Sequence, residues 1–121
     1  MRKNTIAICI AIISLLAACA TPTELRERHV TFAASSTTQN AQQTLTCVAK
    51  GWEQATQQSV NVTNYDKGYT ALAESKTLFG TNTDFVIDSS NAKTGGALFQ
   101  LWSSMKPSAT NKLIDIIQPC L

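Results

Sequence analysis

The sequence predicts an α+β domain with an N-terminal helix, an antiparallel sheet of three to four strands and a C-terminal helix. Apolar residues recur every three or four positions between 41 and 55, which is the period of a helix with one buried face. Between 59 and 103 they alternate with polar residues instead, as in strands. A helical pattern returns after residue 107. Since hairpin-length connections separate the strands, we expect an antiparallel sheet with both helices on one face.

The first 18 residues have the composition of an export signal. Arg2 and Lys3 form a basic start, and the apolar run Ile6–Ala18 is interrupted only by Ser14. A membrane-spanning helix needs about 20 apolar residues, whereas a signal sequence needs an apolar run of about 7–15 residues. We therefore expect residues 1–18 to be removed on export.

The tetrapeptide Leu16-Ala17-Ala18-Cys19 resembles the lipobox of bacterial lipoproteins. The resemblance implies that Cys19 begins the mature chain and carries a diacylglycerol group and an amide-linked fatty acid such as palmitate. More than one acyl chain is needed for durable membrane attachment. In that family, Ala20 in place of an aspartate favours the periplasmic side of the outer membrane over the inner membrane. The alternative is an ordinary cleaved signal with Cys19 present by chance.

The mature chain of about 100 residues has the size of one small domain and carries no net charge. Arg2 and Lys3 account for the whole formal charge of +2, and the other charges are interspersed. A chain without a basic stripe or an acidic block offers no electrostatic surface for nucleic acid. We expect no nucleic-acid partner.

Cys47 and Cys120 are the thiols that remain after Cys9 leaves with the signal and Cys19 is lipidated. In an oxidising compartment two such cysteines most simply form a disulfide. Each belongs to the apolar pattern of one helix, so the bridge would join the first helix to the last. A reactive thiol with His29 as its base is the weaker alternative, because no other residue would orient that histidine.

Residues 19–39, rich in Thr, Ser, Ala and Gln, predict a flexible tether ahead of a domain over 40–121. A short ordered piece within Leu25–Phe32 is an alternative. Asn40 is the expected N-cap of the first helix. Gly51 weakens that helix by about 1 kcal/mol relative to alanine, which indicates a close approach by another element.

The remaining elements follow from alternation and turn residues. Pro107 and Ser108 are expected to begin the last helix and Pro119 to end it. The strand candidates are residues 59–63, 69–74, 83–88 and 97–103, with a turn over 64–68 and a polar loop over Ser89–Gly96.

No constellation for catalysis or metal binding is recognisable in the sequence. One histidine cannot complete a zinc site when both cysteines are paired. Asp84 and Asp88 would lie about 13 Å apart along a strand, too far to share an ion. An envelope hydrolase would need a cleft lined by Asp84, Asp88 or Glu74. We expect no enzyme, no cofactor and no metal.

Aromatic residues are the best candidates for partner contact. Trp102, Tyr65 and Tyr69 are expected near the sheet face away from the helices, which an antiparallel sheet can leave exposed. Trp52 falls within the stripe of the first helix and is expected in the core.

The layout of the mature domain is similar to that of small uncharacterised exported proteins. The shared features are the spacing of Cys47 and Trp52, the Gly68-Tyr69 hairpin and the terminal Pro119-Cys120. The resemblance covers Thr46–Leu121 and brings no known activity.

Together these features predict a membrane-anchored envelope lipoprotein that acts as a non-catalytic binding or assembly module with a protein partner. The alternative is a lipid-anchored inhibitor or immunity protein directed against a lytic enzyme, an effector or a phage component. In that case an exposed loop such as Ser89–Gly96 would insert into the cleft of the target.

Overall fold

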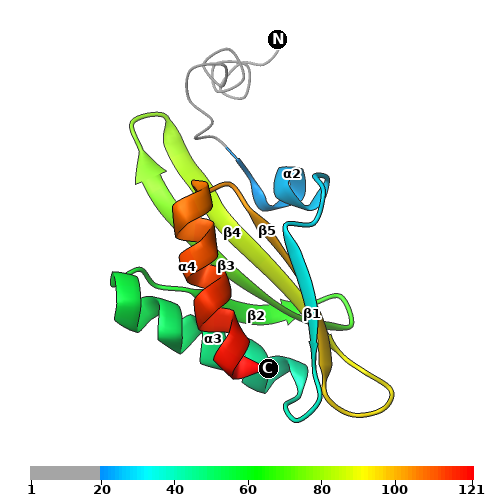
Figure 1. Ribbon diagram of the computed structural model, residues 1–121. Coiled ribbons are helices and arrows are strands. Elements are labelled where there is room, and N and C mark those ends of the chain that lie inside the picture. The colour runs from blue at the N-terminus through cyan, green and yellow to red at the C-terminus, as the bar shows by residue number, and fades with distance from the viewer. Residues whose placement is uncertain (1–19) are drawn as a thin grey trace.

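The computed structural model describes residues 20–121, so Cys19 and the expected signal lie outside the described residues. Within residues 20–121 the chain forms one five-stranded antiparallel sheet in the order β1-β5-β4-β3-β2, together with three α-helices (Figure 1). The strands are β1 (Phe32–Ser36), β2 (Asn61–Tyr65), β3 (Gly68–Thr77), β4 (Gly80–Asn91) and β5 (Ala97–Ser103). The helices are α2 (Pro22–Arg26), α3 (Ala41–Thr56) and α4 (Pro107–Ile117), the last followed by the 3-10 turn η1 (Gln118–Cys120). The predicted α+β class is confirmed, with five strands in place of three to four.

The start of α3 is set by a reciprocal cap. The Asn40 side chain accepts a hydrogen bond from the Gln43 backbone N–H at 2.8 Å, and the Gln43 side chain accepts one from the Asn40 N–H at 3.1 Å. Both bonds satisfy amide groups that a helix leaves without partners in its first turn. The predicted N-cap is therefore confirmed.

Helices α3 and α4 pack on the same face of the sheet. Trp52 of α3 contacts the edge of Phe85 in β4, with ring centroids 5.5 Å apart. Leu113 and Ile117 of α4 are fully buried in the same cluster. The other members of this core that are fully buried are Leu45, Val48, Ala71, Ala73, Ile87 and Leu101.

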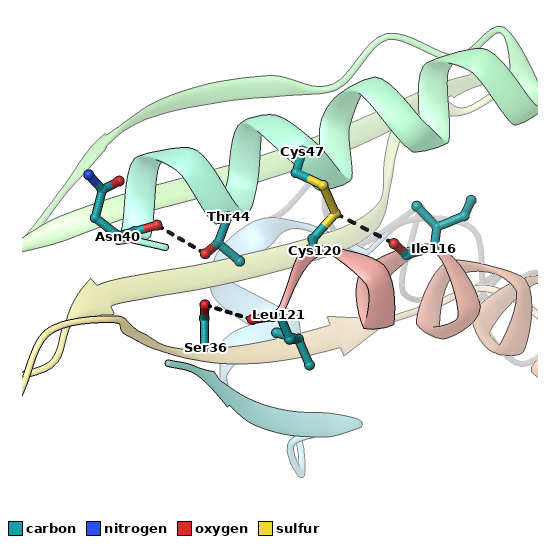
Figure 2. Close-up of a disulfide and its surroundings, with 7 residues drawn as sticks. All are labelled: Ser36, Asn40, Thr44, Cys47, Ile116, Cys120 and Leu121. Atoms are coloured by element: carbon teal, nitrogen blue, oxygen red, sulfur yellow. Dashed lines mark hydrogen bonds between the residues drawn. A yellow bond between two sulfur atoms is a disulfide. The ribbon is translucent and has the colours of Figure 1, made fainter. Parts of the chain in front are cut away.

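The predicted disulfide joins Cys47 of α3 to Cys120 of η1, with the two Cα atoms 5.7 Å apart (Figure 2). The two cysteines are 73 residues apart in the sequence. Beside the bridge, the Ser36 hydroxyl at the end of β1 donates to the Leu121 carbonyl oxygen at 3.0 Å. The C-terminus is thus attached both to a helix and to an edge strand.

The segment expected as a flexible tether differs from that expectation, because it contributes α2 and β1 to the fold. The Thr21 side chain accepts from the Glu24 N–H, the Glu24 side chain accepts from the Thr21 N–H, and Pro22 occupies the first turn. These features favour a helix start. Leu25 then buries completely, and β1 pairs antiparallel with β5.

Helix α2 lies on the face of the sheet opposite α3 and α4. Leu25 packs there with Val86 of β4, Trp102 of β5 and Ala20. The sheet therefore has a helix on each face, whereas the sequence predicted helices on one face only. A short segment with a single large apolar residue shows no helical periodicity, and its local cap is stabilised by the tertiary contacts of Leu25.

The longest hairpin joins β3 to β4 and contains a bulge. Ala73 pairs with Phe85 and Glu74 with Thr83, so Asp84 has no opposite residue in this ladder. The hairpin has more strand residues than the sequence predicted, and β4 continues to Asn91. The polar loop expected over Ser89–Gly96 is thereby reduced to residues 92–96.

None of the helices in the part of the chain described here combines the length and apolar character needed to cross a membrane.

Candidate functional site

Helix α2 covers only part of its face of the sheet. Two residue pairs of the β4–β5 ladder show where the cover by α2 ends. Val86 and its partner Trp102 lie beneath α2, whereas Ser90 and its partner Leu98 lie beyond it. Around this uncovered end is a pocket of about 610 Å³. We call its outward-facing part the open sheet surface and define it by Ala33, Tyr65, Asp88, Ser90, Leu98 and Gln100, all of which line the pocket.

A cluster around Arg26 forms the boundary between α2 and the open sheet surface. Its guanidinium group donates to both carboxylate oxygens of Asp88, at 2.8 and 2.9 Å, and to the Thr70 hydroxyl at 3.1 Å. The guanidinium carbon also lies 3.9 Å from the centre of the Tyr65 ring, within the range of a cation–π interaction. Hydrogen bonding to Asp88 raises the pKa of Arg26 although partial burial opposes the change.

This cluster orients two residues of the pocket wall. Because Asp88 accepts two parallel hydrogen bonds from Arg26, its carboxylate has one fixed direction. Tyr65 ends β2 and is held from one side by Arg26. The wall is therefore organised before any ligand binds, which reduces the entropic cost of binding.

The open sheet surface combines apolar and polar groups, and its one charged side chain, Asp88, is paired with Arg26. Leu98 is 53% exposed, although leucine is more often buried. Gln100 lies opposite Asp88 in the ladder and adds an amide, and Asp66 and Lys67 of the β2–β3 turn contribute one charge of each sign. An apolar centre beside polar groups is typical of a protein contact surface.

Gly68 closes this wall where β3 leaves the turn. A Cβ atom at this position would lie 2.0 Å from the Ser89 carbonyl oxygen of β4. No side chain fits there, so glycine permits the close approach of the two strands. The Gly68-Tyr69 pair noted in the sequence thus has a structural role at the pocket.

The aromatic residues predicted for partner contact separate into two groups. Tyr65 and Tyr69 both line the pocket, but Tyr69 packs against the core cluster on the face of α3 and α4, so its expected position on the other face is wrong. Trp102 is only 7% exposed, lies in the cluster with Leu25, and donates its indole N–H to the Arg28 carbonyl oxygen at 3.2 Å. The expectation of Trp102 as a surface contact therefore differs from the structure, because α2 covers it. Trp52 is buried in the core as predicted, with its N–H donated to Gln58.

Arg26 and Leu98 are parts of the site that the sequence reasoning did not select. The Thr21-Pro22-Thr23-Glu24 start was a readable signal for the helix that carries Arg26. Leu98 was readable as an outward residue, because it alternates with Phe99 and Leu101. What no local pattern indicates is that Arg26 meets a carboxylate 62 residues away.

The three acidic residues considered for catalysis do not meet in one cleft. Asp88 is bound to Arg26, and Glu74 is exposed on β3. Asp84 accepts hydrogen bonds from Gln58, Ser75 and Asn82 and does not line the pocket. Over residues 20–121 no group of three His, Cys, Asp or Glu side chains is arranged to hold a metal ion. The groups at the pocket can donate and accept hydrogen bonds and offer apolar contact.

The chain matches no protein-family model, no curated protein sequence and no solved structure.

Proposed function

We propose that the protein is a lipoprotein of the bacterial envelope, anchored by lipid on Cys19 to the periplasmic side of the outer membrane, and that it acts as a non-catalytic binding or assembly module. The observation that carries the proposal is the lipobox-like tetrapeptide Leu16-Ala17-Ala18-Cys19, which directly precedes Ala20, a buried residue of the domain. Removal of residues 1–18 would leave a folded domain whose second residue is Ala20.

The attachment of Ala20 supports this assignment. Ala20 is 2% exposed, its N–H donates to the Asn82 side chain at 3.0 Å, and its carbonyl oxygen accepts from the Thr83 N–H at 2.8 Å. Consecutive Cα atoms are about 3.8 Å apart. A lipid on Cys19 would therefore hold the folded domain directly at the membrane, without an intervening spacer.

The open sheet surface supports a binding role, and its chemistry favours a protein partner. Leu98 supplies exposed apolar area and Tyr65 an aromatic ring held by Arg26. Aromatic and apolar residues within a polar rim are enriched at protein interfaces. The lining contains two acidic residues and one basic residue, so it offers no excess positive charge for a nucleic-acid backbone.

The alternative of a lipid-anchored inhibitor or immunity protein depends on a loop that inserts into a target. The loop proposed for this role is short, since Ala92–Gly96 is closed by the hydrogen bonds Ala92 N–H to Gly96 and Gly95 N–H to Ala92. A hollowed surface fits a module that receives part of a partner better than one that penetrates a cleft. For this reason we place the binding module first.

The anchor is tested by the mass of the mature protein from bacterial membranes. We expect loss of residues 1–18 and the added mass of a diacylglycerol group and a fatty acid, all abolished by Cys19→Ser. An unmodified Met1 terminus, or a mature chain without fatty acid, contradicts the lipoprotein assignment.

The binding surface is tested by photo-cross-linking in intact cells. A photoreactive amino acid at Leu98 should give a discrete adduct, whereas the same group at Lys112, exposed on α4 behind the other face of the sheet, should not. Adducts from both positions, or from neither, contradict a partner at the open sheet surface.

A further inference from the structure

The turn between β3 and β4 presents two apolar side chains to solvent. Leu78 is 96% exposed, more than any other large apolar residue in the described chain, and its neighbour Phe79 is 41% exposed. Exposed leucines are common as single residues. Two adjacent exposed apolar side chains at the tip of the longest hairpin need an explanation beyond chance exposure.

The geometry of the turn does not require apolar residues there. The Thr77 hydroxyl donates to the Gly80 carbonyl oxygen at 2.9 Å and accepts from the Phe79 N–H at 3.1 Å. Gly80 supplies the positive φ angle of +129°, and neither Leu78 nor Phe79 has a positive φ. Short hairpin turns favour Asn, Asp and Gly. Since the fold gains nothing from a Leu-Phe tip, we look for its partner outside the domain.

This tip lies at the same end of the molecule as the start of the described chain (Figure 1). Ala20 is hydrogen-bonded to Asn82 and Thr83 of β4, and Phe79 precedes Asn82 by three residues. At about 3.3 Å per residue the tip extends roughly 10 Å beyond the level of Ala20. The polar layer of a bilayer is about 5–8 Å thick on each side of its hydrocarbon core. A side chain at the tip would therefore cross that layer if lipid is attached next to Ala20.

We propose that Leu78 and Phe79 insert into the membrane beside the acyl chains of Cys19 and form a second point of attachment. The inference rests on the proposed lipid anchor and extends it. Lys76 is exposed two residues before Leu78, where its ammonium group can contact anionic headgroups. The partner of the tip is a lipid surface, because the lipid anchor on Cys19 would bring the membrane to this end of the fold.

Two attachment points fix the orientation of the domain. The sheet stands on its β3–β4 end, with its strands pointing away from the membrane. Asp88 lies six residues beyond Asn82 on β4, and Ser90 lies eight residues beyond it. At about 3.3 Å per residue, the open sheet surface is held roughly 20–26 Å above the level of Ala20. The surface thus faces the periplasm within reach of a partner that does not touch the bilayer.

The test uses the mature lipidated protein in phospholipid vesicles with bromine on the upper acyl chain, which quenches nearby fluorophores. An environment-sensitive label is placed at Thr81→Cys, an exposed position that leaves both tip residues intact. The same label is placed in the Leu78→Ser/Phe79→Ser background. A third label at Lys93→Cys marks the opposite end of the strands.

We expect quenching at Thr81→Cys to be at least twofold stronger with the native tip than with the serine tip, and negligible quenching at Lys93→Cys. Equal quenching with both tips overturns the inference, as does quenching at Lys93→Cys that matches Thr81→Cys. A tip covered by a protein would give an adduct to that protein from a photoreactive group at Leu78, with no lipid adduct, and would also overturn it.

Failure of the anchor is distinguishable from failure of the insertion. A protein without fatty acid, which washes from vesicles in all three labelled forms, contradicts the proposed function. A protein that stays bound through its acyl chains but shows no effect of the serine tip contradicts only the inference. The serine tip is expected to leave the urea midpoint unchanged, because both side chains are exposed.

Discussion

Gly51 of α3 faces Ile116 of α4 so closely that no side chain fits between them. A Cβ atom built on Gly51 would lie 2.6 Å from the Cγ2 methyl of Ile116. The sequence indicated a close approach at this glycine, and the contact with α4 confirms it. The contact lies one helical turn from Cys47, so the disulfide and the glycine together hold the two helices side by side.

Replacing Gly51 with alanine should destabilise the fold by about 1 kcal/mol. Overpacking against Ile116 costs about 1–3 kcal/mol, and the better helix propensity of alanine returns about 1 kcal/mol. In the Ile116→Ala background the same change should instead stabilise by up to about 1 kcal/mol. Urea unfolding of the four proteins of this cycle measures both values. Stabilisation by Gly51→Ala in the native background would show that the helices are not in contact here.

Removing the disulfide should lower the free energy of unfolding by about 4 kcal/mol. The bridge closes a loop of 73 residues, and on the chain-entropy model such a loop restricts the unfolded state by about that amount. The comparison is between the native protein and the Cys47→Ala/Cys120→Ala variant in urea. Addition of a reductant should shift only the native protein. A loss below about 1 kcal/mol would mean that the bridge does not constrain the unfolded chain.

Leu25→Ala should detach α2 from the sheet and expose Trp102. Leu25 is fully buried, and truncation of a buried leucine costs about 2–5 kcal/mol. In a Trp52→Phe background the emission of Trp102 should shift to longer wavelength. Val30→Ala serves as the control, because Val30 is exposed and its truncation should change stability by less than about 0.5 kcal/mol. Unchanged emission in Leu25→Ala would contradict this prediction, because it would mean that residues other than α2 shield the Trp102 indole from solvent.

Asp88→Asn should loosen α2 without unfolding the domain. The side chains of Arg26 and Asp88 are each about one-fifth exposed, so the pair is partly screened, and its loss should cost about 1–2 kcal/mol. Hydrogen exchange of the amides over residues 24–28 should accelerate, while that of α3 should stay slow. Thr63→Ala, at an exposed position of the edge strand β2, two strands from β4, provides the control. Equal exchange in Asp88→Asn and the native protein would indicate that Leu25 alone holds the helix.

Local sequence patterns predicted most features of the sheet face that packs against α3 and α4. The cap at Asn40, the stripe of α3, the alternation of β5 and the pairing of Cys47 with Cys120 were all readable. Each depends on the spacing of neighbouring residues or on counting cysteines in a chain that is expected to be exported. These signals are short in range and therefore visible in the primary structure.

The other face of the sheet could not be read in the same way. An alternating strand shows that Trp102 and Phe99 point to opposite faces, but not which element covers each. Helix α2 has five residues and one large apolar side chain, too few for a periodic signal. It covers Trp102 only once β4 and β5, which come much later in the sequence, have paired beneath it.

The sequence by itself determined the α+β class, the helix–strand–helix order, the cysteine pair and the lipobox-like start, because these follow from local periodicity and residue type. Tertiary structure alone decided that residues 20–36 join the fold, that Arg26 and Asp88 meet across 62 positions, and that the Leu78-Phe79 tip lies at the same end as Ala20. Such contacts depend on the free energy of packing between distant segments. A polar segment of low periodicity gives no indication of that free energy until its buried partner is known.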